Sequence, residues 1–412
     1  MESFIARRLY QSEQGSRKVS RPAVLIAQAG VALGLAVMLL TIAVSFGFKH
    51  EVREKAVGFS AHLHISNYES AQEYEALPVA ADTALLHTLR SMRGVEYVQR
   101  YVTKPGVFRT DDNFMGYVLK GVGEDYDLSF YAQYLREGVL PQFSDSVASG
   151  EVLISRVIAD KLLLRVGDRV DSYFLQGTMR ARRYTIAGIY ETGFSDYDRL
   201  FVITDLKAVQ TLNRWEADQV AGIEVQLSDF GKLEDMSWEL STILDRTEDK
   251  YGEEYLVQSV TDINPGLFAW LDVLDMNVWL ILALMIGVAA FTMISGLLIL
   301  IIERTQFIGI LKALGASDAS VRKAFLYLAM LIIGKGMLWG NIVGLGLCAI
   351  QKLTHVIPLD PANYYLDCVP IEFNWIFIIA VNVAMFVLSV LVLIVPSHLI
   401  SRIYPTKAMR FE

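Results

Sequence analysis

Four long apolar stretches limit the folds open to this chain more than any other feature of its sequence. None of them contains an acidic residue, and each is long enough to cross about 30 Å of hydrocarbon as an α-helix. They run from Pro22 to Phe48, Val278 to Ile302, Ala324 to Gln351 and Phe373 to Ser401. We therefore expect a membrane protein with four transmembrane helices, at residues 22–48, 275–302, 324–351 and 373–401.

The polar segments between these stretches differ greatly in size. Residues 49–274 are numerous enough to form a domain, whereas residues 303–323 and 352–372 are short loops. The expected fold class is thus a membrane protein of the α+β type. Its large mixed α/β domain lies between the first and second transmembrane helices.

Charge predicts the orientation of the chain in the membrane. Residues 1–21, 303–323 and 402–412 together hold 12 Lys or Arg against 5 Asp or Glu, a net charge of +7. Residues 49–274 hold 23 Lys or Arg against 36 Asp or Glu, a net charge of −13. Because basic residues near the spans stay on the cytoplasmic side, we expect both termini in the cytoplasm and the large domain outside.

Residue patterns within 49–274 alternate between strands and helices. Helices are expected from Asp82 to Met92, from Ser155 to Leu164 and over 229–250. Alternating apolar residues predict strands at 63–66, 95–103, 114–121, 152–155, 169–175, 182–190, 200–204 and 222–227. Asp111-Asp112-Asn113 and Gln176-Gly177 are typical of hairpin turns between strand pairs.

The inner loop, residues 303–323, carries a short amphipathic helix. Phe307, Ile310, Leu311 and Leu314 recur at helical spacing and predict one apolar stripe. Gly315 is expected to end this helix, and Ser317 to cap the next one. A helix this short is marginal alone in water and cannot span a bilayer. Either a cytoplasmic partner protein or the lipid interface is expected to hold it.

The third apolar stretch contains three glycines at four-residue intervals, Gly336, Gly340 and Gly344. Small residues at this spacing favour close packing between transmembrane helices over a ligand site. Lys335 lies near the middle of the same stretch, where a lysine costs about 2.5 to 3.5 kcal/mol on translocon scales. From the sequence, a functional role and a purely structural role of Lys335 are equally open.

Motifs for catalysis or cofactor binding are absent from the sequence. Gly334-Lys335 lacks the first glycine and the Ser or Thr of a phosphate-binding loop. His62-Leu63-His64 places two imidazoles on one strand face, but without a third ligand a solvated strand face is favoured over a metal site. We predict no catalytic residue, no metal site, no cofactor on this chain and no nucleic-acid partner.

The run from Glu303 to Ala316 resembles the R-x-x-E-I-G-I-L-(K/R)-A-L-G-A loop of the FtsX-like and MacB-like ABC permeases. Residues 404–412 resemble their terminal P-x-x-A-L-R-Y-E, and residues 140–170 resemble their periplasmic domain. Within this family, residues 4–10 and 45–48 are most similar to the lipoprotein-releasing permeases of the LolC and LolE type. The likeness covers nearly the whole chain.

The resemblance implies a bacterial inner-membrane complex in which this chain is the permease. Its partners would be two copies of an ATP-binding subunit, which hold ATP and Mg²⁺, a second identical or related permease, and a lipoprotein substrate. The inner loop would be the coupling helix that contacts the ATPase through Glu303, Arg304, Phe307, Ile310, Leu311, Lys312 and Leu314. The outer domain would contain the porter and Sabre parts of this family.

By the same resemblance, acyl chains of the substrate would bind between the first and second spans. The residues expected to line this cavity are Val37, Leu40, Val44, Met276, Leu280 and Leu284, which are apolar and compatible with lipid. In LolC, a long loop between two strands recruits the periplasmic carrier LolA. The matching hairpin here, Tyr173 to Tyr184, is short and lacks proline, which leaves open whether this chain binds a LolA-like carrier.

Two other functions of the family are weighed against lipoprotein release. A MacB-like efflux permease normally carries its ATPase fused before the first span, whereas this chain has 21 residues there. An FtsX-like scaffold would relay ATPase motion to a cell-wall hydrolase, but its outer domain is typically much smaller than residues 49–274. Lipoprotein release is therefore the favoured function.

Overall fold

The structure is a computed structural model that describes residues 20–72, 75–143, 148–176 and 178–397. Most of the predicted N-terminal segment 1–21, the end of the fourth span and the C-terminal segment 402–412 lie outside the described residues. The chain divides into two compact units. The membrane unit contains the described residues up to His50, Trp270–Pro358 and those from Cys368 onward, and the outer unit contains Glu51–Ala269 and Leu359–Asp367.

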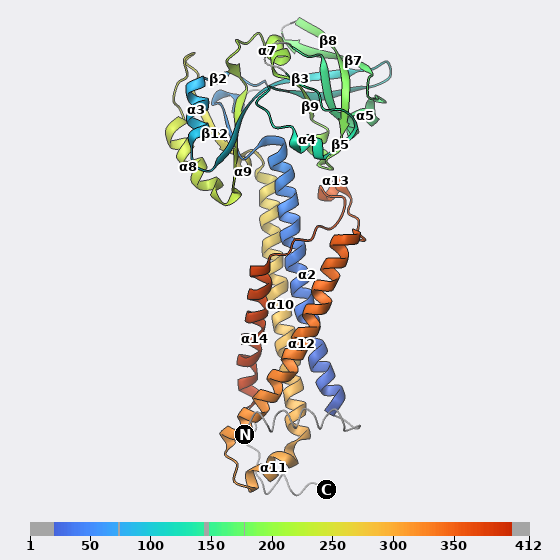
Figure 1. The fold of residues 1–412 in the computed structure, drawn as a ribbon, viewed down its shortest axis with the longest axis vertical. Helices are drawn as coiled ribbons and strands as arrows, with labels where there is room; N and C mark the ends of the chain where they lie inside the picture. The colour runs from blue at the N-terminus through green and yellow to red at the C-terminus, as the bar shows by residue number, and fades with distance from the viewer. Residues whose placement is uncertain (1–19, 73–74, 144–147, 177, 398–412) are drawn as a thin grey trace. The chain divides into compact units, whose positions relative to one another are not determined.

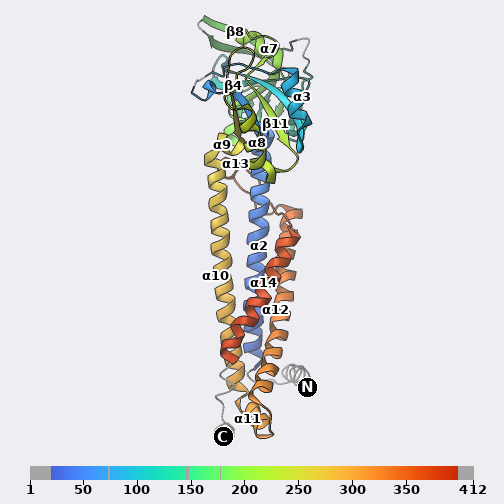
Figure 2. The same ribbon diagram turned by 90° about the vertical axis from the view of Figure 1, so that its left-hand side faces the viewer.

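The membrane unit is built from four long helices, which run side by side in both views of the ribbon (Figures 1 and 2). They are α2 (Ser20–Ser60), α10 (Pro265–Glu303), α12 (Asp318–Thr354) and α14 (Trp375–Ser397), and the short α11 (Thr305–Ala313) joins the second to the third. Each of the four is long and apolar enough to cross a membrane. Both α2 and α10 extend well beyond the predicted spans, because polar residues outside the lipid can continue a helix.

Close approach of backbones positions the spans. A Cβ atom added to Gly336, Gly340 or Gly344 of α12 would lie 2.8 to 3.0 Å from backbone atoms of α2. These three glycines therefore let α12 lie directly against α2. One polar contact adds to this packing: the side-chain amides of Asn341 in α12 and Asn382 in α14 donate hydrogen bonds to each other at 2.7 and 3.0 Å.

The outer unit contains one large, mostly antiparallel sheet in the order β12-β1-β11-β3-β4-β9-β6-β8-β5, with β7 paired to β3 and β8. Among the strands that the structure describes, only β4 with β9 and β6 with β8 pair in parallel. The eight predicted strands are confirmed as β1 (Leu63–Asn67), β3 (Val95–Arg109), β4 (Phe114–Val122), β6 (Glu151–Ser155), β7 (Arg169–Gln176), β8 (Thr178–Tyr190), β9 (Phe201–Asp205) and β11 (Gly222–Leu227). The remaining strands are β2 (Val79–Ala80), β5 (Leu135–Gly138), β10 (Gln219–Val220) and β12 (Tyr255–Ser259).

Strand β3 is longer than predicted because it runs through Pro105. On one side it pairs with β4 over its second half, including Pro105 with Val118. On the other side β11 pairs with residues up to Tyr101, and β7 pairs only from Val107 onward. Pro105 thus lies in the gap between β11 and β7, where a missing N–H group leaves no ladder bond unmade.

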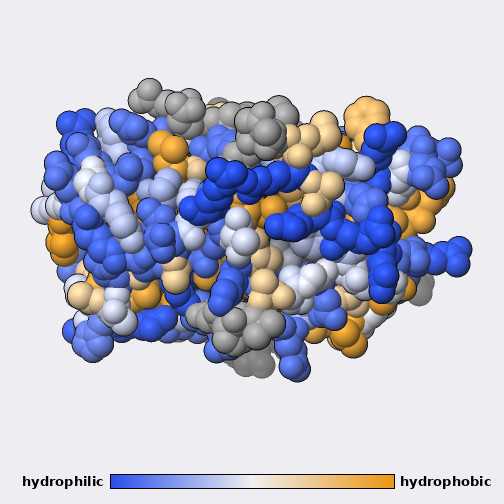
Figure 3. Space-filling model, turned by 90° about the horizontal axis from the view of Figure 1, so that it is seen from above, coloured by the Kyte–Doolittle hydropathy of each residue, from blue (hydrophilic) through white to orange (hydrophobic). Residues whose placement is uncertain are grey.

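The outer unit also contains short helices, several of which pack on this sheet. They are α3 (Thr83–Ser91), α4 (Ser129–Gln133), α5 (Arg156–Leu162), α6 (Ser195–Asp198), α7 (Leu206–Asn213), α8 (Leu233–Leu244), α9 (Val260–Ile263) and α13 (Pro361–Tyr364), with 3-10 turns at Glu69–Gln72 and Phe230–Lys232. The core between helices and sheet is apolar, with large buried side chains such as Phe108, Phe174 and Tyr190. On the face shown in Figure 3, hydrophilic side chains predominate and apolar ones form small separate groups.

The helix predicted over 229–250 is present but shorter than predicted, because its regular part, α8, spans only Leu233–Leu244. It ends where carboxylates begin to bond to the backbone. The Asp245 side chain accepts a hydrogen bond from the Val257 N–H, and Asp249 accepts bonds from the N–H groups of Tyr251 and Glu253. Short acidic side chains compete with the helix in this way and turn the chain into strand β12, which the sequence pattern did not reveal.

Candidate functional site

The inner loop forms the predicted helix as α11, between α10 and α12. The Thr305 hydroxyl donates to the Ile302 carbonyl at 2.6 Å and satisfies a carbonyl at the end of α10. Gly315, at φ +93°, follows α11, and the Ser317 side chain caps α12 by accepting from the Ser320 N–H. The helix and its terminal turn are thus confirmed.

The four residues of the predicted apolar stripe do not share one environment. Phe307 and Leu311 pack partly buried against the core of the membrane unit, beside Ile308, which lies outside the stripe and is fully buried. Ile310 and Leu314 point away from it, with 49% and 80% of their surface exposed. The predicted stripe thus has two parts: Phe307 and Leu311 anchor α11 to its own chain, and Ile310 and Leu314 present two apolar side chains to the surroundings.

The charged residues of the inner loop also divide between two roles. The Lys312 ammonium lies 2.8 Å from a carboxylate oxygen of Asp318, and its side chain is 8% exposed. This ion pair ties the end of α11 to the first turn of α12, where a carboxylate is favourable. Arg304 is half-buried, whereas Glu303 is exposed like Ile310 and Leu314. The exposed residues of the loop therefore include the apolar Ile310 and Leu314 together with polar and charged ones, Glu303, Gln306, Asp318 and Lys323.

Residues predicted to line the substrate cavity lie on two helices. Val37, Leu40 and Val44 of α2 are half-buried, and the last two pack against a cluster of Ala43, Cys348 and Ile371. Met276, Leu280 and Leu284 of α10 are exposed on the surface of the chain. The α10 residues thus offer an open apolar surface of the kind that lipid or a second chain would cover.

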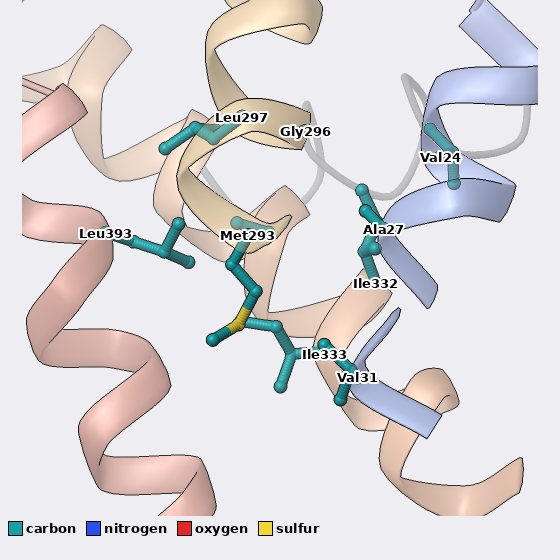
Figure 4. A pocket seen from close by; sticks show the side chains of 10 residues that line it. Val24, Ala27, Val31, Met293, Gly296, Leu297, Ile332, Ile333 and Leu393 are labelled. Atoms are coloured by element: carbon teal, nitrogen blue, oxygen red, sulfur yellow. The ribbon is translucent and has the colours of Figure 1, made fainter. Parts of the chain in front are cut away.

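A small pocket lies elsewhere among the four spans (Figure 4). Its lining is wholly apolar and comes from all four long helices: Val24, Ala27, Val31, Met293, Gly296, Leu297, Ala329, Ile332, Ile333 and Leu393. Its volume is about 20 Å³. That is room for about one water molecule, so this pocket cannot hold an acyl chain.

Lys335 lies on the exposed side of α12, next to Leu338 and Trp339, and not on the side of the glycines. Gly336, its immediate neighbour, is buried against α2. The intramembrane lysine is thus directed toward whatever surrounds α12 in the membrane.

The outer unit buries an ion pair that the sequence did not reveal. The Lys120 ammonium donates to Glu224 at 2.6 Å, to the Phe59 carbonyl at 2.7 Å and to the Tyr126 hydroxyl at 2.9 Å. The other oxygen of Glu224 accepts from Gln99 at 3.0 Å. Both charged side chains are almost fully buried. Loss of any one partner in this network would therefore leave a buried polar group without its hydrogen bond and destabilise this face of the sheet.

The two imidazoles of His62-Leu63-His64 are buried, so the predicted solvated strand face is wrong. The Nδ1 atom of His62 accepts a hydrogen bond from the Leu227 N–H at 3.2 Å. Burial lowers the pKa of His62, and it lowers the pKa of His64 to about 4. Among the described residues, no group of three or more His, Cys, Asp or Glu could hold a metal ion.

His64 lines a cavity of about 370 Å³ on the sheet face, together with Tyr101, Lys120 and Glu224. Other walls come from Phe59 at the end of α2 and from Phe201 of β9. Since Lys120 and Glu224 neutralise each other, the cavity presents hydroxyls, amides and aromatic rings but no net charge. We find no reacting group in it.

The hairpin that matches the carrier-binding loop is formed by β7 and β8, paired from Arg169 with Thr185 to Gln176 with Thr178. A bidentate pair between Arg183 and Asp171 crosses it on the exposed face, at 2.7 and 3.0 Å. Gly177, at the predicted turn, lies outside the described residues. The hairpin is regular on both sides of this position.

Comparisons with known proteins match most of the chain. The MacB-like periplasmic core domain matches residues 24–242, and the FtsX-like permease C-terminal domain matches residues 279–405. The lipoprotein-releasing system transmembrane protein LolC of Xylella fastidiosa (strain Temecula1) is 28% identical and covers 93% of this chain and 92% of its own length. LolE of Haemophilus influenzae is 22% identical, and the matched region covers 92% of this chain and 92% of LolE.

Solved structures also resemble the chain. The periplasmic region of MacB from Actinobacillus actinomycetemcomitans covers 52% of this chain and 95% of its own, at 13% identity and a TM-score of 0.35. At that score the likeness adds nothing to what the family models show.

Proposed function

Because this chain belongs to the family of FtsX-like permeases with a MacB-like periplasmic core, we propose that it extracts lipoproteins from the bacterial inner membrane. In this proposal it is the permease of an ABC complex and releases its cargo toward a periplasmic carrier. ATP and Mg²⁺ bind on a separate ATPase subunit, present in two copies, and a second permease completes the transport path. Both termini and the inner loop face the cytoplasm.

Two relatives support the choice of cargo. LolC of Neisseria meningitidis is 22% identical over 94% of both chains, and both it and the Xylella protein are named as parts of a lipoprotein-releasing system. The match extends over the spans and the outer domain together. This full-length agreement favours lipoprotein release over the efflux and scaffold alternatives.

The exposed pair on α11 is the observation that carries the proposed coupling to an ATPase. Ile310 and Leu314 are one helical turn apart and present apolar surface on the cytoplasmic side of the proposed topology. Ile308 is buried behind them, and Lys312 is paired to Asp318. A partner that pushes on Ile310 and Leu314 would therefore move α11 together with the end of α10 and the start of α12, which α11 joins.

Extraction of lipid also requires an apolar path. Each methylene of an acyl chain gains about 0.8 kcal/mol when it is buried away from water. The exposed side chains of Met276, Leu280 and Leu284 on α10 can supply such a surface opposite Val37, Leu40 and Val44 of a second permease. In this proposal, ATP-driven closure of the paired permeases expels the acyl chains.

The coupling role is tested with the double variant I310D/L314D. Burying two carboxylates in an apolar groove of the partner costs several kcal/mol, so we expect the variant to lose copurification with the ATPase. The matched control is A319D, which adds a carboxylate at an exposed position in the first turn of α12. If I310D/L314D reaches the membrane and still copurifies as the wild type does, α11 is not the docking helix.

A further inference from the structure

The loop between the third and fourth spans belongs to the outer unit and not to the membrane unit. Residues Leu359–Asp367, which include α13, are flanked in the sequence by α12 and α14 (Figure 1), yet they form part of the compact outer unit. The base of the loop is closed by an isolated antiparallel bridge between Pro358 and Cys368, and the Leu359 N–H donates to the Asp367 carbonyl at 2.9 Å. We call residues 359–367 the span-linking loop.

A buried lysine holds this loop. The Lys55 side chain projects from α2, is 4% exposed, and its ammonium donates to the Tyr365 carbonyl at 2.9 Å. The same ammonium donates to the carbonyl of Thr192, which precedes α6. Lys55 therefore joins three segments that are far apart in the sequence: α2, the turn before α6 and the span-linking loop.

Further contacts fasten the loop to the turn before α6. The Tyr365 hydroxyl donates to Asp196 at 3.1 Å, and its ring meets Phe194 edge-on with centroids 4.7 Å apart. The Ser195 hydroxyl donates to the Pro361 carbonyl at 3.3 Å. The loop is thus attached by polar and aromatic contacts that involve both of its halves.

The turn that receives the loop, residues 192–198, is held by several hydrogen bonds of its own. The Asp198 carboxylate, 1% exposed, accepts hydrogen bonds from the N–H and hydroxyl of Thr192 and from the N–H of Gly193, at 2.7 to 3.2 Å. Gly193 has a φ of +74°, and a Cβ added to it would lie within 3.5 Å of Lys55, Pro361 and Asp367. These bonds and short distances hold the turn close to both Lys55 and the span-linking loop.

We propose that Lys55 is a positioning residue for transport, and that through it the span-linking loop makes a third mechanical connection between spans and outer domain. Helices α2 and α10 are the first two connections, because each continues from the membrane unit into the outer unit. The third connection transmits movements of α12 and α14, the helices on either side of the loop. This inference rests on the proposed transport function.

The chemistry at Lys55 explains why a lysine is needed. A buried ammonium is costly unless hydrogen bonds satisfy it, and here two backbone carbonyls accept from it. The negative charge of the Asp198 carboxylate also interacts with it. Methionine has a similar length but no donor. Losing one charge-assisted hydrogen bond is expected to raise the detached population of the loop about tenfold.

The experiment compares K55M and K55R in the full permease–ATPase complex, in a C348A background. Cys368, which is half-buried and next to the loop, is the reporter. In K55M we expect Cys368 to react about tenfold faster with maleimide, lipoprotein release to fall about tenfold or more, and ATP hydrolysis to continue. In K55R, which keeps the charged donors, both the labelling rate and release should return toward those of the wild type.

A second variant guards against misfolding of K55M. Y365G changes only the loop, and because Tyr365 has a φ of 61°, glycine suits its backbone. It removes the contacts with Asp196 and Phe194 and should also uncouple ATP hydrolysis from release. Unchanged Cys368 labelling in both K55M and Y365G would show that these residues do not hold the loop.

Faster labelling with lipoprotein release at the wild-type rate would show that the third connection is not needed for transport, and would overturn the proposal. If the wild-type complex itself releases no lipoprotein, the proposed function fails instead. The labelling comparison still decides whether Lys55 holds the loop in that case.

Discussion

Lys120 in the outer unit and Gly340 in the membrane unit are both buried, but they hold their surroundings together by different means. Lys120 is surrounded by partners that satisfy its charge, and the sheet around it has an apolar core. Gly340 contributes no side chain and lets α12 approach Ala32 of α2. Burial is driven by water in the outer unit, whereas helices surrounded by lipid gain mainly from close packing.

The comparison extends to the surfaces of the two units. Trp279, Leu280 and Phe291 of α10 are each about two-thirds or more exposed, which in water would be a wide apolar patch. In lipid such exposure is not penalised. The outer unit instead places polar residues on the face shown in Figure 3 and buries most of its large aromatic side chains, although Phe114 and Trp238 are exposed.

The strongest test of the comparison removes the charge of Lys120. K120M leaves Glu224 buried without its cation and should destabilise the outer unit by about 3 to 5 kcal/mol. Urea unfolding of the full chain in detergent, followed by proteolysis of the outer unit, measures this loss. The double variant K120M/E224M should recover much of it, since a buried pair can be replaced by apolar groups at little cost. A single variant as stable as the wild type would show that the pair does not organise the sheet.

Acid provides a second test, again in the outer unit. The pKa of His64 falls from 6.5 in the unfolded chain to about 4 in the folded chain, because burial opposes its charged form. The contribution of His64 to the free energy of unfolding is therefore fully present above pH 6.5, and it is lost as the pH falls toward 4. The expected loss is about 3 kcal/mol. H64Q should remove this part of the pH dependence of unfolding.

Asp198 acts in the opposite sense and serves as an internal reference. Burial raises its pKa to about 6, so its contribution is present at low pH and is lost as the pH rises through 6. Asp198 is present in both the wild type and H64Q. The difference between their pH dependences of unfolding therefore reports the histidine alone. Identical pH profiles would mean that His64 does not stay neutral in the folded state.

The smallest expected effect tests the membrane unit. G340A adds a Cβ atom 2.8 Å from the Ala32 carbonyl oxygen, so α2 and α12 must move apart, at a cost of about 1 to 3 kcal/mol. G346A adds the same atom on the same helix where nothing lies within 4 Å. Unfolding in mixed micelles should separate the two variants. Equal stability would contradict close packing as the force that holds these spans.

Local patterns in the sequence were sufficient for the elements that depend on neighbouring residues. The four spans, the eight strands, the helix after Arg304 and the turn at Gly315 follow from apolar periodicity, length and glycine. The family was also recognisable from the inner loop. Its motif is a contiguous run of residues, so no knowledge of distant contacts is needed to find it.

Distant contacts decided the rest. The sequence shows that Phe307, Ile310, Leu311 and Leu314 are apolar, but only the packing of α11 on its own chain separates the covered residues from the exposed ones. Likewise, no local signal marks Glu224 as the partner of Lys120, or His64 as buried. From the sequence, a charged residue is expected to be solvated, because a buried partner more than a hundred residues away changes nothing in the residues around it.

The span-linking loop shows the same limit. From its sequence it is a polar connection between two apolar stretches, and nothing in residues 359–367 indicates that it joins the outer unit. That assignment depends on Lys55, Thr192 and Tyr365 meeting at one ammonium group. Hydrophobic periodicity sets which segments enter the membrane, whereas the pairing of buried polar groups sets which distant segments are held together.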